Sequence, residues 1–223
     1  MDIPEQTPEQ DRFKTLLIRE MRGICELSPE QVAMLWSHYR TLCRWRTKVN
    51  LMSDRRVAEI VKKHYCESLF LAAQLPPVPL SVADVGSGAG FPGVPVAVLR
   101  PDCQITLIEA RSRKTVFLKE ACRHLPNVTV AHCRAEDLGQ RFDWLIARAV
   151  SWPEISRLAA KLSDRLALIV SGKTTKELSG SALVRWDSVI PIPWRKESFV
   201  IMGEARGRDW EVSRGTEAGG AVP

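Results

Sequence analysis

The sequence has no cysteine pair in a C-x-x-C arrangement, although six cysteines are scattered along it: Cys25, Cys43, Cys66, Cys103, Cys122 and Cys133. Zinc cages and disulfide frameworks need closely or regularly spaced cysteines, so neither is predicted. His124 with Cys122 and His132 with Cys133 come nearest to a metal cluster, but adjacent residues on a strand point to opposite faces. We therefore expect reduced, mostly buried thiols and no metal site.

The sequence also lacks an uninterrupted apolar run of about 18 residues, the length that could span a bilayer. It begins with MDIPEQTPEQDR, a polar and acidic stretch without the basic-then-apolar order of a secretory signal. The 223 residues are 45% hydrophobic and 26% charged, which is typical of a globular chain with a sizeable core. We therefore expect a cytoplasmic protein with no membrane partner.

Positive charge is unevenly placed along the chain. Between residues 40 and 63, here called the basic run, eight cationic residues stand against Asp54 and Glu59, a local net charge of +6 that equals the net charge of the whole chain. Such a run is most often a solvated face, but it is also a candidate surface for nucleic acid. Composition alone leaves both interpretations open.

The first 80 residues have the apolar spacing of helices. Ser28, Pro29 and Gln31 form a helix start with a capping box, and a further helix is predicted from about residue 57 to 75. The sequence PPVP then ends the helical pattern, because consecutive prolines cannot continue a helix. We predict a helical segment over 1–79, a second domain over 80–203 and a loose tail over 204–223.

After the prolines, seven short apolar runs alternate with helical segments: SVADV, QITLIE, VTVAHC, FDWLIA, LALIVS, DSVIPI and ESFVIMG. This alternation predicts an α/β fold with a mostly parallel seven-stranded sheet, helices on both faces and the helical segment as an N-terminal extension. The last two runs have little between them, so they are predicted to form an antiparallel hairpin at one edge.

A glycine-rich turn, ADVGSGAGFPGVP at 83–95, follows the first of these runs. In an open α/β sheet, such a turn lets a ligand approach the backbone closely. A dinucleotide fingerprint would need glycine where Phe91 stands, and a phosphate loop would need lysine where Val94 stands. A second phosphate-loop candidate, SGKTT at 171–175, fails because its earlier glycine would fall at Ala167.

What remains is a G-x-G-x-G pattern, which resembles the S-adenosylmethionine site of class I methyltransferases, the Rossmann-like fold. Its glycines are Gly86, Gly88 and Gly90, with Asp84 before them. Glu109 stands 23 positions after Gly86 and ends the second strand, where that family has an acid that binds the ribose hydroxyls. The competing interpretation is a turn that only packs a helix on the sheet.

The absence of two sequence motifs reduces the number of chemical groups that could accept the methyl group. An N-P-P-Y type motif, which serves exocyclic amines, is absent from the segment LIARAVSWPE after the fourth strand. No cysteine follows Cys133, so the covalent route to carbon 5 of a pyrimidine is closed. Ring N7 of guanine has a free lone pair and no proton to lose, so it needs neither motif.

Five segments, in this order and spacing, resemble a family of bacterial 16S ribosomal RNA guanine-N7 methyltransferases, also called glucose-inhibited division protein B. They are KVNLMSDR, KHYCESL, DVGSGAGFPGVPVAVLRP, RAEDL and FDWLIARAVS. The resemblance runs from about residue 28 to 203. It implies a monomeric enzyme that transfers a methyl group from S-adenosylmethionine to 16S rRNA of the small ribosomal subunit.

The resemblance also implies roles for individual residues. The implied cofactor-binding residues are Asp84, Gly86, Gly88, Gly90, Phe91, Glu109, Ala135, Glu136 and Arg148. The implied catalytic residues are Asn50, with its neighbour Leu51, His64 and Arg148. The charge of the basic run predicts Arg44, Arg46 and Lys48 as RNA-binding residues. The resemblance adds Arg55, Arg113, Lys114 and Lys173. From spacing alone, His64 is a core histidine and Arg148 a paired strand-end arginine; Arg148 is also placed to hold a substrate phosphate or the guanine acceptor face.

The chain departs from the family pattern at two places. Glu67 and Glu109 stand where the family often has aspartate, and a longer carboxylate can do the same work. Ser171 and Gly172 stand where the family commonly has lysine and glycine, which makes Lys173 the candidate replacement. Two other functions keep the same fold: a methyltransferase for a small molecule or protein, and a nonenzymatic S-adenosylmethionine-binding module.

Overall fold

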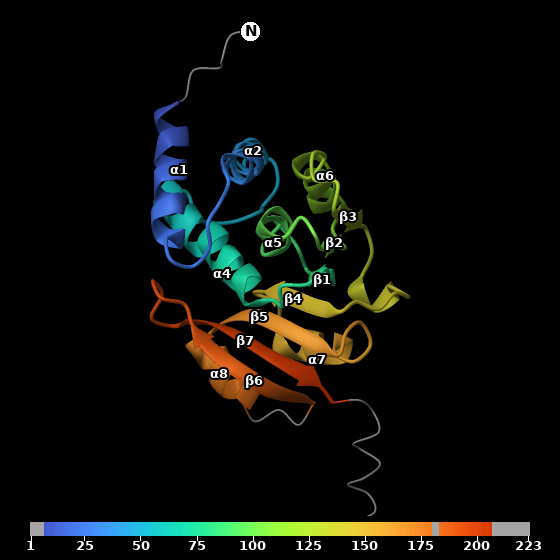
Figure 1. Cartoon of the computed structure of the whole chain (residues 1–223). Helices are drawn as coiled ribbons and strands as arrows, with labels where there is room; N and C mark the ends of the chain where they lie inside the picture. Colours follow the sequence, from blue (N-terminus) through green and yellow to red (C-terminus); the bar gives the residue numbers. More distant parts are fainter. Residues whose placement is uncertain (1–6, 180–182, 207–223) are drawn as a thin grey trace, which may run out of the picture.

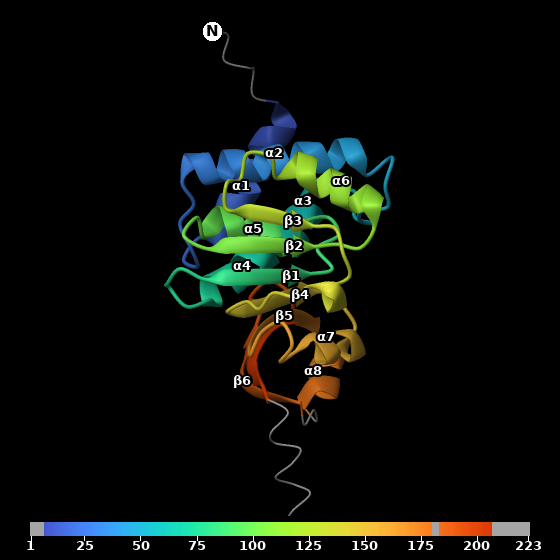
Figure 2. The ribbon, with the colours of Figure 1, turned by 90° about the vertical axis from the view of Figure 1, so that its right-hand side faces the viewer.

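The structure, a computed structural model, describes residues 7–179 and 183–206 and contains a seven-stranded sheet between two helical layers (Figures 1 and 2). The strands are β1 (Ser81–Val85), β2 (Gln104–Ile108), β3 (Val128–Ala131), β4 (Trp144–Arg148), β5 (Arg165–Ser171), β6 (Val184–Pro191) and β7 (Ser198–Ala205). Their order is β3-β2-β1-β4-β5-β7-β6. β1 to β5 pair in parallel, whereas β7 is antiparallel to both β5 and β6. The mostly parallel sheet and its edge hairpin are confirmed.

Helices cover both faces of this sheet, as predicted. One layer contains α1 (Pro8–Met21), α2 (Pro29–Trp45), α3 (Val57–Ile60), the π-helical turn η1 (Val61–Cys66), α4 (Glu67–Gln74), α5 (Gly93–Leu99) and α6 (Ser112–Ala121). The other contains α7 (Trp152–Leu158) and α8 (Gly172–Ser179), and a short 3₁₀ turn, η2 (Ala135–Asp137), follows β3. In Figure 1 the first layer lies above the sheet and α7 and α8 lie below it.

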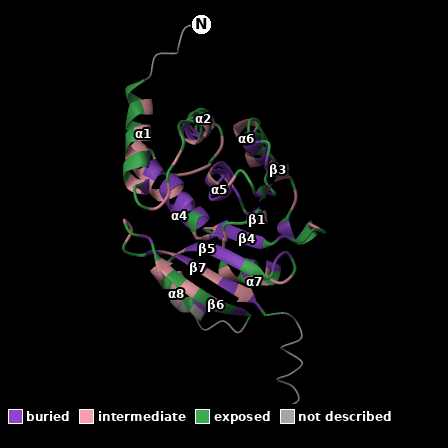
Figure 3. Cartoon of the chain, viewed as in Figure 1, coloured by how far each residue is buried: buried purple, intermediate pink, exposed green. Residues whose placement is uncertain are grey.

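The side chains of the central strands alternate between two cores. In β4, Trp144 and Ile146 belong to the core under α1 to α6, and Leu145 and Ala147 to the core under α7 and α8. This follows from the period of two along a strand, which sends successive side chains to opposite faces. Figure 3 shows that β4 and β5 are largely buried and that the outer sides of α1, α2 and α6 are exposed.

The N-terminal helices share one core with the sheet. Phe13, Leu17 and Met21 of α1 are buried in the same cluster as the strand residues of the upper face. The capping box at Ser28 is confirmed, since the Ser28 hydroxyl accepts from the backbone N–H of Gln31 and the Gln31 side chain accepts from that of Ser28. The Gln31 amide also donates to the carbonyl of Val98 in α5, at 3.0 Å. The predicted helical segment is therefore packed as part of the fold.

The helix predicted from about residue 57 to 75 is present as α3, η1 and α4, which follow one another without a break. Its middle turn, η1, is π-helical, a feature that sequence periodicity did not predict. A π turn inserts one extra residue into a helix and is frequent at functional sites, because it changes the direction of the side chains it carries. Lys62, Lys63 and His64 lie in this turn.

At the C-terminal side, β7 continues to Ala205, two residues beyond the predicted domain boundary at 203. Arg206 follows β7, and the rest of the predicted tail, 207–223, lies outside the described residues. No helix within 7–179 and 183–206 combines the length and apolar character that a bilayer span requires.

Candidate active site

The glycine-rich turn leaves β1 and enters α5 with backbone angles that favour glycine. Gly86, Gly88 and Gly90 have φ of +70°, +55° and +86°. At Gly90 a side chain is excluded for two reasons: the positive φ disfavours it, and a Cβ there would lie 2.7 Å from Cγ2 of Val94. Gly93 is required for another reason: a Cβ would lie 2.3 Å from Cδ2 of Leu107 in β2. The glycines therefore allow both the tight turn and the close packing of α5 on the sheet.

Asp84 lies beneath this turn and faces neither of the cavities described below. Its side chain is fully buried, and its Oδ2 accepts a hydrogen bond of 3.0 Å from the N–H of Gly93. Burial raises the pKa of Asp84 to about 7. The carboxyl group joins β1 to the first turn of α5 and supports the loop from below, and contact of Asp84 with the cofactor stays a prediction.

Glu109 lies directly after β2, beside the glycine-rich turn. Its two carboxylate oxygens accept from the backbone N–H of Gly88, at 3.0 Å, and from that of Arg111, at 2.9 Å. Each carboxylate oxygen can accept more than one hydrogen bond, so both retain capacity for a ligand. Glu109 thus fixes the glycine turn and presents acceptors beside it.

A cavity of about 810 Å³, here called the strand-end cavity, opens at the carboxyl ends of β1, β2 and β4. Its apolar lining includes Val85, Ile108, Ala135 and Val150, and its polar lining includes Glu109, Arg111, Lys114, Glu136 and Glu154. Ligands of open α/β sheets bind at this edge, where the connections on either side of the first strand diverge. The predicted cofactor residues Gly86, Glu109, Ala135 and Glu136 all line it.

A second cavity of about 380 Å³, the loop cavity, adjoins the first one and shares Gly86, Lys114 and Ala149 with it. It is lined by 51–54 from the loop after α2, by Lys63 and His64 of η1, by 86–89 and Phe91 of the glycine turn, and by Arg148. Ala149 has φ of +57°, which is unusual for a residue with a side chain and is common at functional sites.

The loop cavity contains a polar network centred on Arg148. The Nη1 of Arg148 lies 2.5 Å from Nδ1 of His64, and Nε2 of His64 lies 2.8 Å from Oδ2 of Asp54. A guanidinium can only donate, so Nδ1 of His64 accepts and Nε2 carries the proton that is donated to Asp54. Burial and the neighbouring Arg148 lower the pKa of His64 to about 4. His64 is therefore neutral at neutral pH, with both ring nitrogens engaged.

Arg148 also forms an ion pair with a buried carboxylate. Its Nη2 lies 3.0 Å from Oε2 of Glu67, whose side chain is 1% exposed, and Nε of Arg195 lies 3.2 Å from Oε1 of the same residue. Burial raises the pKa of Glu67, although both arginines act in the opposite direction. The structure therefore combines the two interpretations of Arg148, since it is a paired strand-end arginine that also lines the cavity.

Several predicted residues lie elsewhere. Asn50 is exposed on the loop after α2 and does not line the loop cavity, although Leu51 does. Gly90 faces inward, toward Val94 and His38. Arg113 on α6 and Lys173 on α8 line neither cavity, whereas Lys114 lines both.

The predicted RNA-binding residues of the basic run do not lie on one common surface. Arg44 turns toward α6 and pairs with Glu120, at 2.8 Å. Arg46 donates to the carbonyl of Arg55, at 3.5 Å, and the Arg55 side chain is exposed. Lys48 follows α2 and lines none of the cavities described here. Residues that share a charge run in the sequence therefore face different surfaces of the molecule.

The residues of the loop cavity that were not predicted include Asp54, Lys63 and Ala149. The two charged residues belong to the basic run, but nothing in their spacing indicated that Lys63 pairs with Asp54 at 3.1 Å or that both line the cavity. The unusual backbone at Ala149 has no signal in the sequence, because alanine carries no preference for positive φ.

The residues present fit S-adenosylmethionine. The apolar walls of the strand-end cavity suit a purine ring, and Glu109 offers acceptors for ribose hydroxyls. A Cβ on Gly88 would lie 3.8 Å from Nζ of Lys114, so the absence of a side chain there leaves room for a ligand. Among the described residues, no group of His, Cys, Asp and Glu side chains is arranged to hold a metal ion.

The sequence matches one family over most of its described length. The model of the family described as rRNA small subunit methyltransferase G matches residues 31–179. The protein named ribosomal RNA small subunit methyltransferase G from Desulforamulus reducens is 33% identical over 135 residues, 56% of this chain and 56% of that protein. The one from Porphyromonas gingivalis is 30% identical over 168 residues, 74% of this chain and 75% of that protein. The first three relatives of this name are matched over 56% to 62% of their length.

Solved structures share the fold at low sequence identity. The fibrillarin pre-rRNA processing protein of Methanococcus jannaschii superposes with a TM-score of 0.50 at 16% identity, covering 60% of this chain and 71% of that one. Aeropyrum pernix fibrillarin with natively bound S-adenosyl-L-methionine gives a TM-score of 0.50 at 14% identity, covering 61% of this chain and 73% of that one. These similarities show that the chain shares the α/β fold of both proteins.

Proposed function

Because the chain belongs to the rRNA small subunit methyltransferase G family, we propose that it transfers a methyl group from S-adenosylmethionine to N7 of a guanine in 16S rRNA. The observation that supports this most is the junction of the two cavities at Gly86, Lys114 and Ala149. A cofactor held in the strand-end cavity would there meet a substrate held in the loop cavity.

The strand-end cavity holds the cofactor in this proposal. Glu109 binds the ribose hydroxyls, Ala135 and Glu136 lie at the adenine end, and the glycine turn, with Gly86 and Gly88, lies against the methionine end. When bound, S-adenosylmethionine supplies a methyl group already activated by its sulfonium, so the protein mainly has to align an acceptor with it.

The loop cavity orients the guanine. Arg148 uses donors for His64 and Glu67 and has others left, which we assign to O6 of guanine, the acceptor next to N7. His64 holds Arg148 in place and is no general base, because its acceptor nitrogen is occupied. This agrees with an N7 acceptor, whose lone pair reacts without the loss of a proton.

The rest of the proposal concerns the substrate and the state of the enzyme. Action as a monomer is part of the proposal. A ribosomal substrate places the enzyme in the cytoplasm. Because N7 of a paired guanine lies in the deep, narrow major groove of an RNA helix, the target must be in a loop or be extruded from its helix.

The test is transfer of labelled methyl from S-adenosylmethionine to small ribosomal subunits, or their naked rRNA, from a strain that lacks this gene. We expect label on one guanine, lost when that base is converted to its N7-methyl form beforehand, and none on large subunits used as the control. Label on protein, on a small molecule or on another base would contradict the proposal. Binding of the cofactor without any transfer would support a nonenzymatic module instead.

A further inference from the structure

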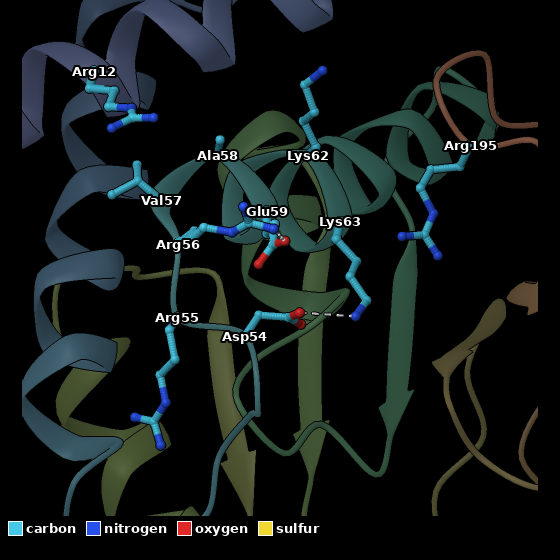
Figure 4. A pocket seen from close by; sticks show the side chains of 10 residues that line it. All are labelled: Arg12, Asp54, Arg55, Arg56, Val57, Ala58, Glu59, Lys62, Lys63 and Arg195. Carbon is cyan, nitrogen blue, oxygen red and sulfur yellow. Dashed lines mark hydrogen bonds and ion pairs between the residues drawn. The ribbon is translucent and has the colours of Figure 1, made fainter.

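A third cavity of about 680 Å³, here called the basic cleft, lies next to the loop cavity. Its lining contains six cationic side chains, Arg12, Arg55, Arg56, Lys62, Lys63 and Arg195, with Asp54, Val57, Ala58 and Glu59. Figure 4 shows that these side chains come from three distant parts of the chain: α1, the segment 54–63, and the connection between β6 and β7. The fold therefore brings Arg12 and Arg195, which lie far apart in the sequence, next to the cations at 55–63 of the basic run.

The positive charge of the cleft is only partly neutralised. Four of the six cations have acidic partners: Lys62 pairs with Glu20, Lys63 with Asp54, Arg56 with Glu59, and Arg195 with the buried Glu67 behind the cleft. Arg12 and Arg55 are exposed, and neither guanidinium has a hydrogen-bond or ion-pair partner among the described residues. The cleft therefore presents unpaired donors from two separate elements, which suits an anion that lies between them.

The cleft adjoins the loop cavity, because Asp54 and Lys63 line both. A guanine in the loop cavity would thus have its neighbouring nucleotides at the mouth of the basic cleft. Within the described part of the chain, no aromatic side chain lines the cleft, so it has no surface on which bases would stack. Its chemistry fits the phosphates of an RNA strand and not the bases.

A second group of arginines makes a useful comparison. Arg40, Arg44 and Arg123 line a smaller cavity between α2 and α6, of about 190 Å³, where Glu120 pairs with Arg44 at 2.8 Å. This cavity shares no lining residue with the loop cavity. Two of its arginines, Arg40 and Arg44, belong to the basic run, but their cavity does not adjoin the loop cavity in which the guanine is proposed to bind.

We propose that the basic cleft binds the phosphates of the RNA strand adjoining the target guanine, with Arg12 and Arg55 as direct phosphate contacts and Arg195 at the far wall. This inference rests on the proposed function. It assigns RNA contacts to Arg12 and Arg195, which lie outside the basic run, and removes Arg40, Arg44 and Arg123 from the path of the strand. Recognition in the cleft is independent of base sequence.

The experiment measures the affinity of the protein for a short fluorescent single-stranded RNA from about 50 to 200 mM salt. The cleft variant Arg12→Ala/Arg55→Ala is compared with the control variant Arg40→Ala/Arg123→Ala, which removes the same charge from outside the cleft. We expect the cleft variant to lose about tenfold in affinity and its salt slope to become shallower by about 1.4, the value for two lost contacts to a single strand. The control should change by less than about twofold, since its charges act only at a screened distance.

Affinity for S-adenosylmethionine should be the same in all three proteins, which shows that the variants fold. Equal RNA affinity in wild type and the cleft variant, or an equal loss in the control, would overturn the inference. So would a cleft variant that keeps its RNA affinity but no longer binds polyglutamate, because the cleft would then dock an acidic protein. This experiment measures RNA binding and does not depend on methyl transfer. If the wild-type protein methylated no rRNA, the proposed function would be wrong, but the comparison of the two variants would still test the role of the cleft.

Discussion

His64 shows how a single residue is defined by its partners. The donor-only guanidinium of Arg148 on one side and the carboxylate of Asp54 on the other leave one tautomer, with the proton on Nε2. The spacing Ile60, Val61, His64 is that of a core position, and the residue is indeed largely buried, but it faces the loop cavity. In the proposed function, His64 positions Arg148.

At the residue scale, we expect His64 to stay neutral from pH 8 down to about 5, because burial and Arg148 lower its pKa to about 4. Imidazole nitrogen shifts followed by NMR over this pH range should show the Nε2–H tautomer without titration. In Arg148→Gln the neighbouring positive charge is gone, so the pKa of His64 should rise toward its ordinary value. A wild-type His64 that titrates near its ordinary pKa of about 6.5, or that carries its proton on Nδ1, would contradict the network.

At the scale of elements, the connection from β1 to α5 depends on backbone shape more than on side chains. Three of its glycines have positive φ, and Gly93 lies too close to Leu107 and Asp84 for any side chain. Asp84 and Glu109 hold the turn from below and from the rim through backbone N–H groups. The sequence predicted the turn and both acids, but not that only Glu109 faces a cavity.

Two glycines of this turn provide a matched pair for a stability measurement. Gly88→Ala meets only ordinary contacts, so we expect a loss of about 1 to 2 kcal/mol in the free energy of unfolding from the left-handed backbone alone. Gly90→Ala has the same backbone cost, and its Cβ would lie 2.7 Å from Val94 and 3.0 Å from His38, so the loss should be about 2 to 4 kcal/mol. Urea unfolding distinguishes them; equal losses would mean that the region around Gly90 yields freely.

For the molecule as a whole, α1 is part of the same folding unit as the sheet. The ring of Phe13 lies within 5.4 Å, between centroids, of Trp36, Tyr39 and Tyr65, and all four belong to the core that continues to the strands. This packing fixes Arg12 at the wall of the basic cleft, one residue away from Phe13. The position of the cleft therefore depends on the core beneath it.

We expect Phe13→Ala to lower the free energy of unfolding by about 3 to 5 kcal/mol, the usual cost of truncating a buried phenylalanine. Far-UV circular dichroism and tryptophan fluorescence should report one shared transition, since α1 and the sheet form a single core. Ile18→Ala on the same helix is the control. Ile18 is 50% exposed, so this substitution should change the free energy of unfolding by no more than about 0.5 kcal/mol. Two separate transitions would show that α1 unfolds on its own.

The sequence by itself determined the alternation of strands and helices, the edge hairpin, the glycine turn and the acid after β2, because these depend on local periodicity and on fixed spacing. Only the tertiary structure decided that His64 pairs with Arg148 across 84 positions, that Glu67 joins Arg148 to Arg195, and that Arg12 meets Arg55 at one cleft. Contacts of this kind arise from packing between elements far apart in the chain. The sequence gives the number of cationic residues in the basic run, but the surface on which each side chain lies depends on the tertiary fold.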